Sequence, residues 1–189
     1  MNYPTTKSRV AVFIDGGNFY FKLKELEVKN ISHFGYRQLA EWLARDRTVI
    51  FVGYYVGVVR AQPNDVKGQK LRAGQVGLFN YLRSKEQRLA IRQGYLMKNN
   101  GVYHEKGVDV QIAVDLLVGA YDNSYDTAIL LSSDTDLLPA IKKVRELGKA
   151  VEYIGFAHRP TIALQTRATL SRLLIKEELE PFVANNYKE

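Results

Sequence analysis

The sequence contains no cysteine, which removes several kinds of site at once. Disulfide bonds, thiolate zinc sites, iron–sulfur clusters and thiol nucleophiles all need cysteine. The three histidines, His33, His104 and His158, are scattered along the chain, and each is typical of a surface or loop residue rather than a metal ligand. The sequence therefore disfavours zinc, and any metal site is expected to use mainly oxygen ligands.

Long apolar runs and a secretory signal are also missing. No run approaches the roughly 20 apolar residues that cross a bilayer, and the opening segment MNYPTTKSR has neither an apolar core nor a cleavage site. We therefore expect a cytoplasmic protein without a membrane span. Hydrophobic residues form 46% of the 189 residues, and no linker or repeat divides them. We expect a single domain with a frayed tail from about residue 181.

Two common phosphate-binding motifs are absent as well. The chain has no Walker-type G-x-x-x-x-G-K-[ST], and D-G-G-N at residues 15–18 stands where a dinucleotide fold would carry G-x-G-x-x-G. The D-x-D at Asp134 and Asp136 is similar to that of aspartyl-phosphate phosphatases, but those enzymes carry it after the first strand. The positions of these motifs therefore disfavour both a dinucleotide-binding fold and an aspartyl-phosphate phosphatase.

Positive charge is concentrated in the middle of the chain. The net charge is 27 − 20 = +7, and residues 61–106 carry nine Lys/Arg against three Asp/Glu, whereas residues 107–189 carry nine against twelve. Cations bind phosphates and clustered carboxylates bind divalent metals, so this division suits a nucleic acid that one region holds and another attacks. The alternative is that this uneven charge reflects only ordinary variation among surface residues.

Hydrophobic patterning predicts an α/β fold with a central, mostly parallel sheet flanked by helices. Apolar or alternating runs predict strands at 10–14, 48–59, 88–97, 127–131, 150–154 and 173–175. The turn signal at 99–101 predicts a hairpin or an edge extension of the sheet. Helical spacing predicts helices at 18–28, 36–45, 67–84, 108–120, 137–147 and 161–171. The strand–helix–strand order over residues 127–154 requires parallel neighbours joined by a right-handed crossover.

Two helices carry further expectations. The segment 108–120 is almost wholly apolar, so we expect it to be central, and we expect Leu71, Leu78, Phe79 and Leu82 of segment 67–84 to face the core. The main set of cations, which we expect to guide a nucleic-acid backbone unless they form only a solvated face, is Lys67, Lys70, Arg72, Arg83, Lys85, Arg88 and Arg92. Tyr54 or Tyr55 could stack an unpaired base, although core packing is favoured for both.

Acidic residues lie at the ends of two predicted strands, where open parallel sheets bind their ligands. Asp15 ends the first strand and Asp134 and Asp136 follow the strand at 127–131, while Asp109 begins the helix at 108–120. Each alone could be a helix cap or a turn former. Together they converge if the two strands are neighbours.

Such a cluster favours a divalent cation. Two carboxylates about 4 Å apart repel by roughly 4 kcal/mol at an effective dielectric of 20, so the group must bind a cation or stay partly protonated. An all-oxygen shell completed by water and phosphate suits Mg²⁺ or Mn²⁺. Ser132 and Ser133 are poor candidates for a covalent mechanism because no Ser–His pair is visible.

Three segments together resemble the NYN family, which has the PIN-like nuclease fold, and within it the LabA-like branch. They are FIDGGNFY (13–20), KGVDVQIAVDLL (106–117) and ILLSSDTDLLPAIKKVRELGKAVEYIGF (129–156). With the elements between them the resemblance covers about residues 8–176. It implies a three-layer PIN-like (Rossmannoid) fold and a metal-dependent, ribonuclease-like site.

The resemblance also implies roles for single residues. The expected Mg²⁺ or Mn²⁺ ligands are Asp15, Asp109, Asp134 and Asp136. Asn18 matches the family's active-site asparagine, whose amide could bond the scissile phosphate or brace a carboxylate.

Three further residues are expected to contact the ligand residues rather than the metal itself. Asp115 matches the family pattern but lies six positions after Asp109, about 120° off that helix face, so it supports the ligands or is a buried structural acid. Ser132 and Ser133 flank the acidic turn, and Ser133 stands where many relatives have glycine.

The leading hypothesis is a metal-dependent endoribonuclease that cleaves phosphodiester bonds in single-stranded RNA. One or two metal ions would hold the phosphodiester and activate water, so no side-chain nucleophile is required. The alternative is a catalytically silent PIN-like regulatory module that binds RNA or a protein partner. A DNA substrate and a homodimer stay open.

Overall fold

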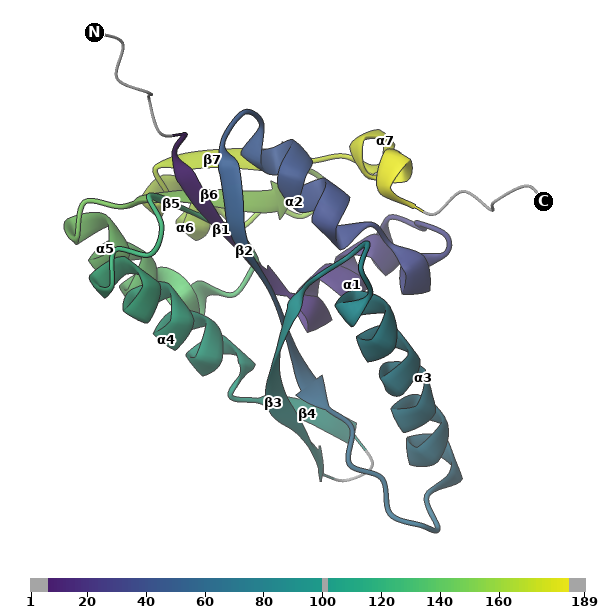
Figure 1. The fold of residues 1–189 in the computed structure, drawn as a ribbon. Helices are drawn as coiled ribbons and strands as arrows, with labels where there is room; N and C mark the ends of the chain where they lie inside the picture. The colour runs from purple at the N-terminus through teal and green to yellow at the C-terminus, as the bar shows by residue number, and fades with distance from the viewer. Residues whose placement is uncertain (1–6, 100–101, 184–189) are drawn as a thin grey trace, which may run out of the picture.

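The residues that the structure describes fold around one seven-stranded sheet with helices on both faces (Figure 1). The computed structural model describes residues 7–99 and 102–183. The strands are β1 (Arg9–Asp15), β2 (Thr48–Val58), β3 (Ala90–Asn99), β4 (Val102–Lys106), β5 (Thr127–Leu131), β6 (Ala150–Phe156) and β7 (Leu170–Leu174). The helices are α1 (Gly16–Glu25), α2 (Tyr36–Ala44), α3 (Val66–Arg83), α4 (Val108–Tyr121), α5 (Leu138–Glu146), α6 (Ile162–Arg167) and α7 (Lys176–Leu179), with 3₁₀ turns η1 (Ile31–His33), η2 (Thr135–Leu137) and η3 (Glu180–Phe182).

The strand order confirms the predicted central, mostly parallel sheet. It runs β4-β3-β2-β1-β5-β6-β7, and every neighbouring pair is parallel except the β3–β4 hairpin. The chain builds outward from β1 through β2 and β3, and later returns to the other side of β1 through β5. The carboxyl ends of β1 and β5 therefore meet at a topological switch point, where open α/β sheets bind ligands.

The central strand shows why continuous apolar runs predicted the sheet. Val10, Val12 and Ile14 of β1 pack into the core beneath α1, α2 and α3, whereas Ala11 and Phe13 pack into the core beneath α4 and α5. Successive strand residues point to opposite faces, so a strand covered on both faces must be apolar at every position. The strand is polar only at its two ends, Arg9 and Asp15.

A close contact fixes the turn that follows β1. Gly16 begins α1 directly after Asp15, and a Cβ at Gly16 would overlap the ring of Tyr54. Tyr54 is buried on the neighbouring strand β2, and its ring packs against Tyr36. Only glycine allows α1 to start this close to the sheet.

Two expectations about burial are wrong. Leu71 of α3 is 44% exposed, because the first half of α3 runs beside β3 and β4 where these elements extend beyond the rest of the sheet (Figure 1). Helix α4 is not central but covers one face of the sheet. Its inner side is buried, while an apolar outer side is exposed, formed by Val110, Val114, Val118 and Tyr121.

Other boundaries also differ from those predicted. The helix expected over 161–171 ends at Arg167, because Leu170–Leu174 pairs with β6 as the edge strand β7. The expected fraying from Pro181 is wrong for residues 181–183, where Phe182 is buried and its carbonyl accepts the Gly35 N–H. Residues 100–101 of the predicted hairpin turn and residues 184–189 of the tail lie outside the described residues. Among the helices that the structure describes, none is both long and apolar enough to span a membrane.

Candidate functional site

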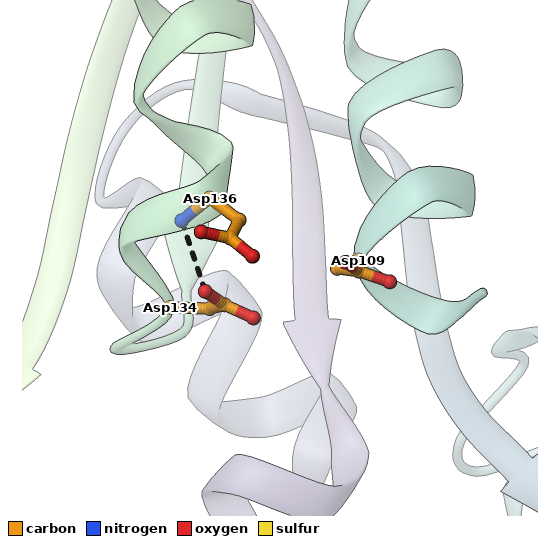
Figure 2. A group of neighbouring side chains, drawn as sticks. All are labelled: Asp109, Asp134 and Asp136. Carbon is orange, nitrogen blue, oxygen red and sulfur yellow. Dashed lines mark hydrogen bonds between the residues drawn. The ribbon is translucent and has the colours of Figure 1, made fainter. Parts of the chain in front are cut away.

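Three aspartates meet at the carboxyl edge of the sheet. Asp109 comes from the first turn of α4, and Asp134 and Asp136 come from the turn after β5 (Figure 2). One carboxylate oxygen from each lies within 4.8 Å of the others. Two chain segments that are distant in sequence thus bring three negative charges together.

The local sequence holds the turn after β5. The Asp134 carboxylate accepts the Asp136 N–H at 2.9 Å, drawn in Figure 2, and the Asp134 N–H donates to Ser132 Oγ at 3.1 Å. Bonds of this kind between an aspartate and the backbone two residues on are typical of Asx turns. The D-x-D spacing thereby fixes both carboxylates on one short turn.

Asp109 is placed by the start of α4. Gly107 has φ +77°, a left-handed conformation that glycine adopts without strain, and it turns the chain from β4 into the helix. Asp109 then lies in the first helical turn, where the unpaired N–H groups favour a negative charge.

Asp15 lies deeper than the other three acids. It is 8% exposed, and its carboxylate accepts the Asn18 N–H at 3.0 Å and the Ser132 hydroxyl at 2.9 Å. With Asp109, Asp134 and Lys106 it lines a cavity of about 340 Å³. Burial raises the pKa of Asp15, and the charges of Asp134 and Asp109 raise it further, while the two hydrogen bonds act in the opposite direction. A cation in this cavity would lower the cost of ionising Asp15.

Asn18 and Ser133 connect α1 to the acidic turn. Asn18 Nδ2 donates to Ser133 Oγ at 2.6 Å, and Thr161 Oγ1 donates to the Ser133 carbonyl at 3.4 Å. Ser133 thus joins α1, the acidic turn and the loop before α6. The structure places both predicted supporting serines, Ser132 and Ser133, in contact with predicted site residues.

Asp115 bonds residues other than the four acids. Its carboxylate accepts hydrogen bonds from Tyr55 Oη at 2.9 Å, Gln111 Nε2 at 2.8 Å and Arg92 Nε at 3.0 Å. Burial, and then the charge of Asp115, raise the pKa of Tyr55 above its usual range. Asp115 thus bonds Tyr55, Gln111 and Arg92, and these contacts fit the alternative interpretation of Asp115 as a structural acid.

The candidate stacking residues are also placed differently. Tyr54 and Tyr55 are fully buried in the two cores, so neither can stack a nucleic-acid base, and the alternative of core packing is correct. Helix α1 instead exposes the rings of Tyr20 and Phe21, which sequence reasoning missed.

The predicted cations form two separate groups. Lys67, Lys70 and Arg72 lie in the first half of α3, which follows the carboxyl end of β2 and so lies toward the same edge as the acids. Arg83, Lys85 and Arg88 lie at the opposite end, because Lys67 and Arg83 are about 24 Å apart along the helix axis. Arg92 forms an ion pair with Asp115 instead of facing solvent alone.

A second charged cluster links α1 to the loop after β6, and sequence reasoning missed it. The Glu25 carboxylate accepts from Lys22 Nζ and Arg159 Nη1, each at 3.1 Å, and His158 Nε2 lies 3.0 Å from it. The pKa of Glu25 falls to about 2, first because of the His158 hydrogen bond and then because of Lys22. His158 and Arg159 follow the carboxyl end of β6, so the rule that located the acids could have found them.

The Asp15 side chain gives a test of electrostatic strain. In buffer without divalent ions we expect Asp15→Asn to raise the melting temperature at neutral pH. A carboxyl whose pKa is raised in the folded state opposes folding when it ionises, so its effect grows as pH rises above its ordinary value. For a chain of this size about 1 kcal/mol corresponds to about 2–4 °C.

Asp126→Asn is the control with the opposite sign. Arg9 lowers the pKa of Asp126 to about 2, so its charge stabilises the fold above about pH 4 and that stabilisation is lost as pH falls toward 2. This variant should melt earlier at neutral pH. A lower melting temperature for Asp15→Asn would contradict the electrostatic description of the cavity.

Comparison with known proteins agrees with the resemblance seen in the motifs. The sequence matches the NYN domain over residues 9–174. It is 24% identical over 177 residues to the low amplitude and bright protein LabA of Synechococcus elongatus, across 93% of this chain and 88% of LabA. It is 36% identical over 95 residues to the uncharacterized protein MJ0482 of Methanocaldococcus jannaschii, across 50% of this chain but only 38% of the relative's length.

A solved structure shares the fold. The crystal structure of VPA0982, a protein of unknown function from Vibrio parahaemolyticus, superposes with a TM-score of 0.62 at 20% identity, across 94% of this chain and 98% of that one. The similarity to LabA supports the LabA-like branch. Since the family match covers residues 9–174, the chain belongs to the NYN domain family, whose PIN-like fold is of the nuclease type.

Proposed function

We propose that the protein is a metal-dependent nuclease that cleaves phosphodiester bonds in RNA, with single-stranded RNA as its substrate. The observation that carries the proposal is the acid centre, in which carboxylate oxygens of Asp109, Asp134 and Asp136 lie within 4.8 Å of one another. It lies at the switch point of the sheet in a chain of a nuclease-type family. RNA, rather than DNA, is proposed from the family resemblance.

The donor set fits a hard divalent cation. The acid centre offers carboxylate oxygens without thiolate or imidazole, which suits Mg²⁺ or Mn²⁺. Asp109, Asp134 and Asp136 would hold the ion, and the buried Asp15 would add negative charge behind them. A bound divalent ion supplies Lewis-acid stabilisation of a phosphoryl group and lowers the pKa of water.

The remaining groups of the site would bind and orient the substrate. Lys106 lines the cavity beside Asp15 and Asp109, where its ammonium can neutralise a phosphate oxygen. Asn18 uses one amide hydrogen on Ser133 and keeps a second hydrogen and an oxygen for substrate or a carboxylate. The cations in the first half of α3 would hold the strand as it approaches the acid centre.

One observation favours the alternative of a silent regulatory module. The exposed outer side of α4, formed by Val110, Val114, Val118 and Tyr121, carries no charge and could contact a protein partner or a second copy of the chain. Such a module would have no need for metal-dependent turnover. The acid centre weighs toward the enzyme, because three converging carboxylates without a cation only repel one another.

Neutralising one acid separates the two functions. We expect the purified protein to cleave labelled single-stranded RNA in Mn²⁺ or Mg²⁺, and Asp134→Asn to lower the rate by about 100-fold or more, because several kcal/mol of charge stabilisation are lost. The matched control is Asp122→Asn, which removes an exposed carboxylate at the far end of α4. Absent cleavage, or equal cleavage by wild type and Asp134→Asn, would favour the silent module.

The division of the α3 cations gives an independent binding test. Neutralising Lys67, Lys70 and Arg72 together should lower the slope of log K against log salt by about 2, since each phosphate contact with a single strand contributes about 0.7. Neutralising Arg83, Lys85 and Arg88 is the matched control and should leave the slope nearly unchanged. Equal effects of the two triple variants would place the nucleic acid along the whole of α3.

A further inference from the structure

Helix α1 carries an exposed aromatic pair, Tyr20 and Phe21. It begins beside Asp15, and Phe19 and Leu23 turn one side of it into the core. Phe21 lies about 200° around the helix from Phe19 and is 64% exposed. The ring of Tyr20 packs against it edge-on, with ring centroids 5.6 Å apart. Phe21 is about 9 Å along the helix axis from Asp15.

A partly free guanidinium is bonded to the same helix, at Glu25. Glu25 is one helical turn after Phe21, so the two share a face of α1. Arg159 donates to Glu25 through Nη1, and its side chain is 73% exposed. A guanidinium has five N–H donors. Among the described residues, Glu25 is the ion-pair partner of Arg159. The remaining donors are available to a ligand.

The balance of charge in this cluster suits a phosphate. Two permanent cations, Lys22 and Arg159, share the single carboxylate of Glu25, and His158 contacts the same carboxylate. Lys22 is almost buried and holds Glu25 in place, whereas Arg159 lies at the surface. The cluster therefore keeps an excess of positive charge on its exposed side.

Hydrogen bonds connect this surface to the acid centre. Asn18 of α1 and Thr161 of the loop after β6 both bond Ser133, the residue before Asp134. Strand β6 is also the immediate neighbour of β5, which leads into the acidic turn. The aromatic ring, the guanidinium and the acids thus belong to one connected edge of the sheet.

We propose that Phe21 and Arg159 form a subsite for one unpaired nucleotide of a strand bound at the acid centre. The base stacks on the Phe21 ring, and a phosphate replaces part of the contact between Arg159 and Glu25. The proposal rests on the proposed function, because it takes the strand to be a nuclease substrate. It favours single strands as the substrate class, since a paired base would first have to break its pairing and leave its stack to cover the ring.

Binding in the absence of turnover tests the subsite. In the Asp134→Asn background, Phe21→Ala should raise the Kd for a short single-stranded RNA by about 5- to 100-fold, the scale of one lost base–aromatic stack, and Phe21→Trp should keep it. Arg159→Ala should raise the Kd and lower the salt slope by about 0.7. Glu25→Gln should lower the Kd, because it removes the charge that competes with phosphate.

Matched controls separate the subsite from general effects. Val114→Ala and Lys142→Ala remove an exposed apolar group and an exposed cation elsewhere, and should leave the Kd unchanged. A blunt duplex of the same sequence should bind all variants alike. Strands with a 5′-phosphate and a 5′-hydroxyl end distinguish a terminal from an internal phosphate as the ligand of Arg159, and an effect in either arm supports the subsite.

The failure of this inference is distinct from failure of the proposed function. If Phe21→Ala and Arg159→Ala bind single strands as tightly as their parent, or weaken single strand and duplex equally, the subsite is overturned whether or not RNA is cleaved. If the variants behave as expected and wild type does not cleave in Mn²⁺, the subsite stands and the nuclease proposal fails.

Discussion

Repulsion among carboxylates at the switch point is the constraint on which the rest of the site depends. Three of the four acids have a local feature that stabilises the charged carboxylate. The Asn18 N–H and the Ser132 hydroxyl bond Asp15, the Asp136 N–H bonds Asp134, and the start of α4 favours Asp109. These contacts reduce the repulsion without removing it, because the pKa of Asp15 stays raised. A divalent cation is the simplest ligand that would neutralise the remaining negative charge of the carboxylates.

The sheet creates this constraint. An open parallel sheet that grows outward on both sides of β1 must leave the carboxyl ends of β1 and β5 beside each other. Whatever follows these strands is gathered at one edge. Cations lie on both flanks of that edge, with Lys67 and Lys70 toward β2 and Arg159 toward β6. The arrangement suits an extended polyanion that crosses the edge from one flank to the other.

Much of the fold could be predicted because its signals are local. The apolar runs of β1 and β5 follow from burial on both faces, and the acids follow from the positions where those runs end. Burial depth could not be predicted in the same way. The apolar sequence of α4 predicts a central helix, although only one side of α4 packs on the sheet. Nothing local in the sequence shows that Asp15 is more buried than Asp109.

Contacts between residues far apart in the sequence could not be predicted either. The pairing of Glu25 with Arg159 joins residues more than a hundred positions apart, and no periodicity in either segment indicates it. The two groups of cations at the two ends of α3 belong to one basic segment of the sequence, but the length of the helix separates them.

A crystal structure of the protein with Mn²⁺, recorded at a wavelength that reveals the ion's anomalous scattering, tests the central claim most directly. The account predicts a peak between the carboxylates of Asp109, Asp134 and Asp136, with Asp15 behind it. A structure at millimolar Mn²⁺ without a peak there, or with these side chains turned away from one another, would contradict it.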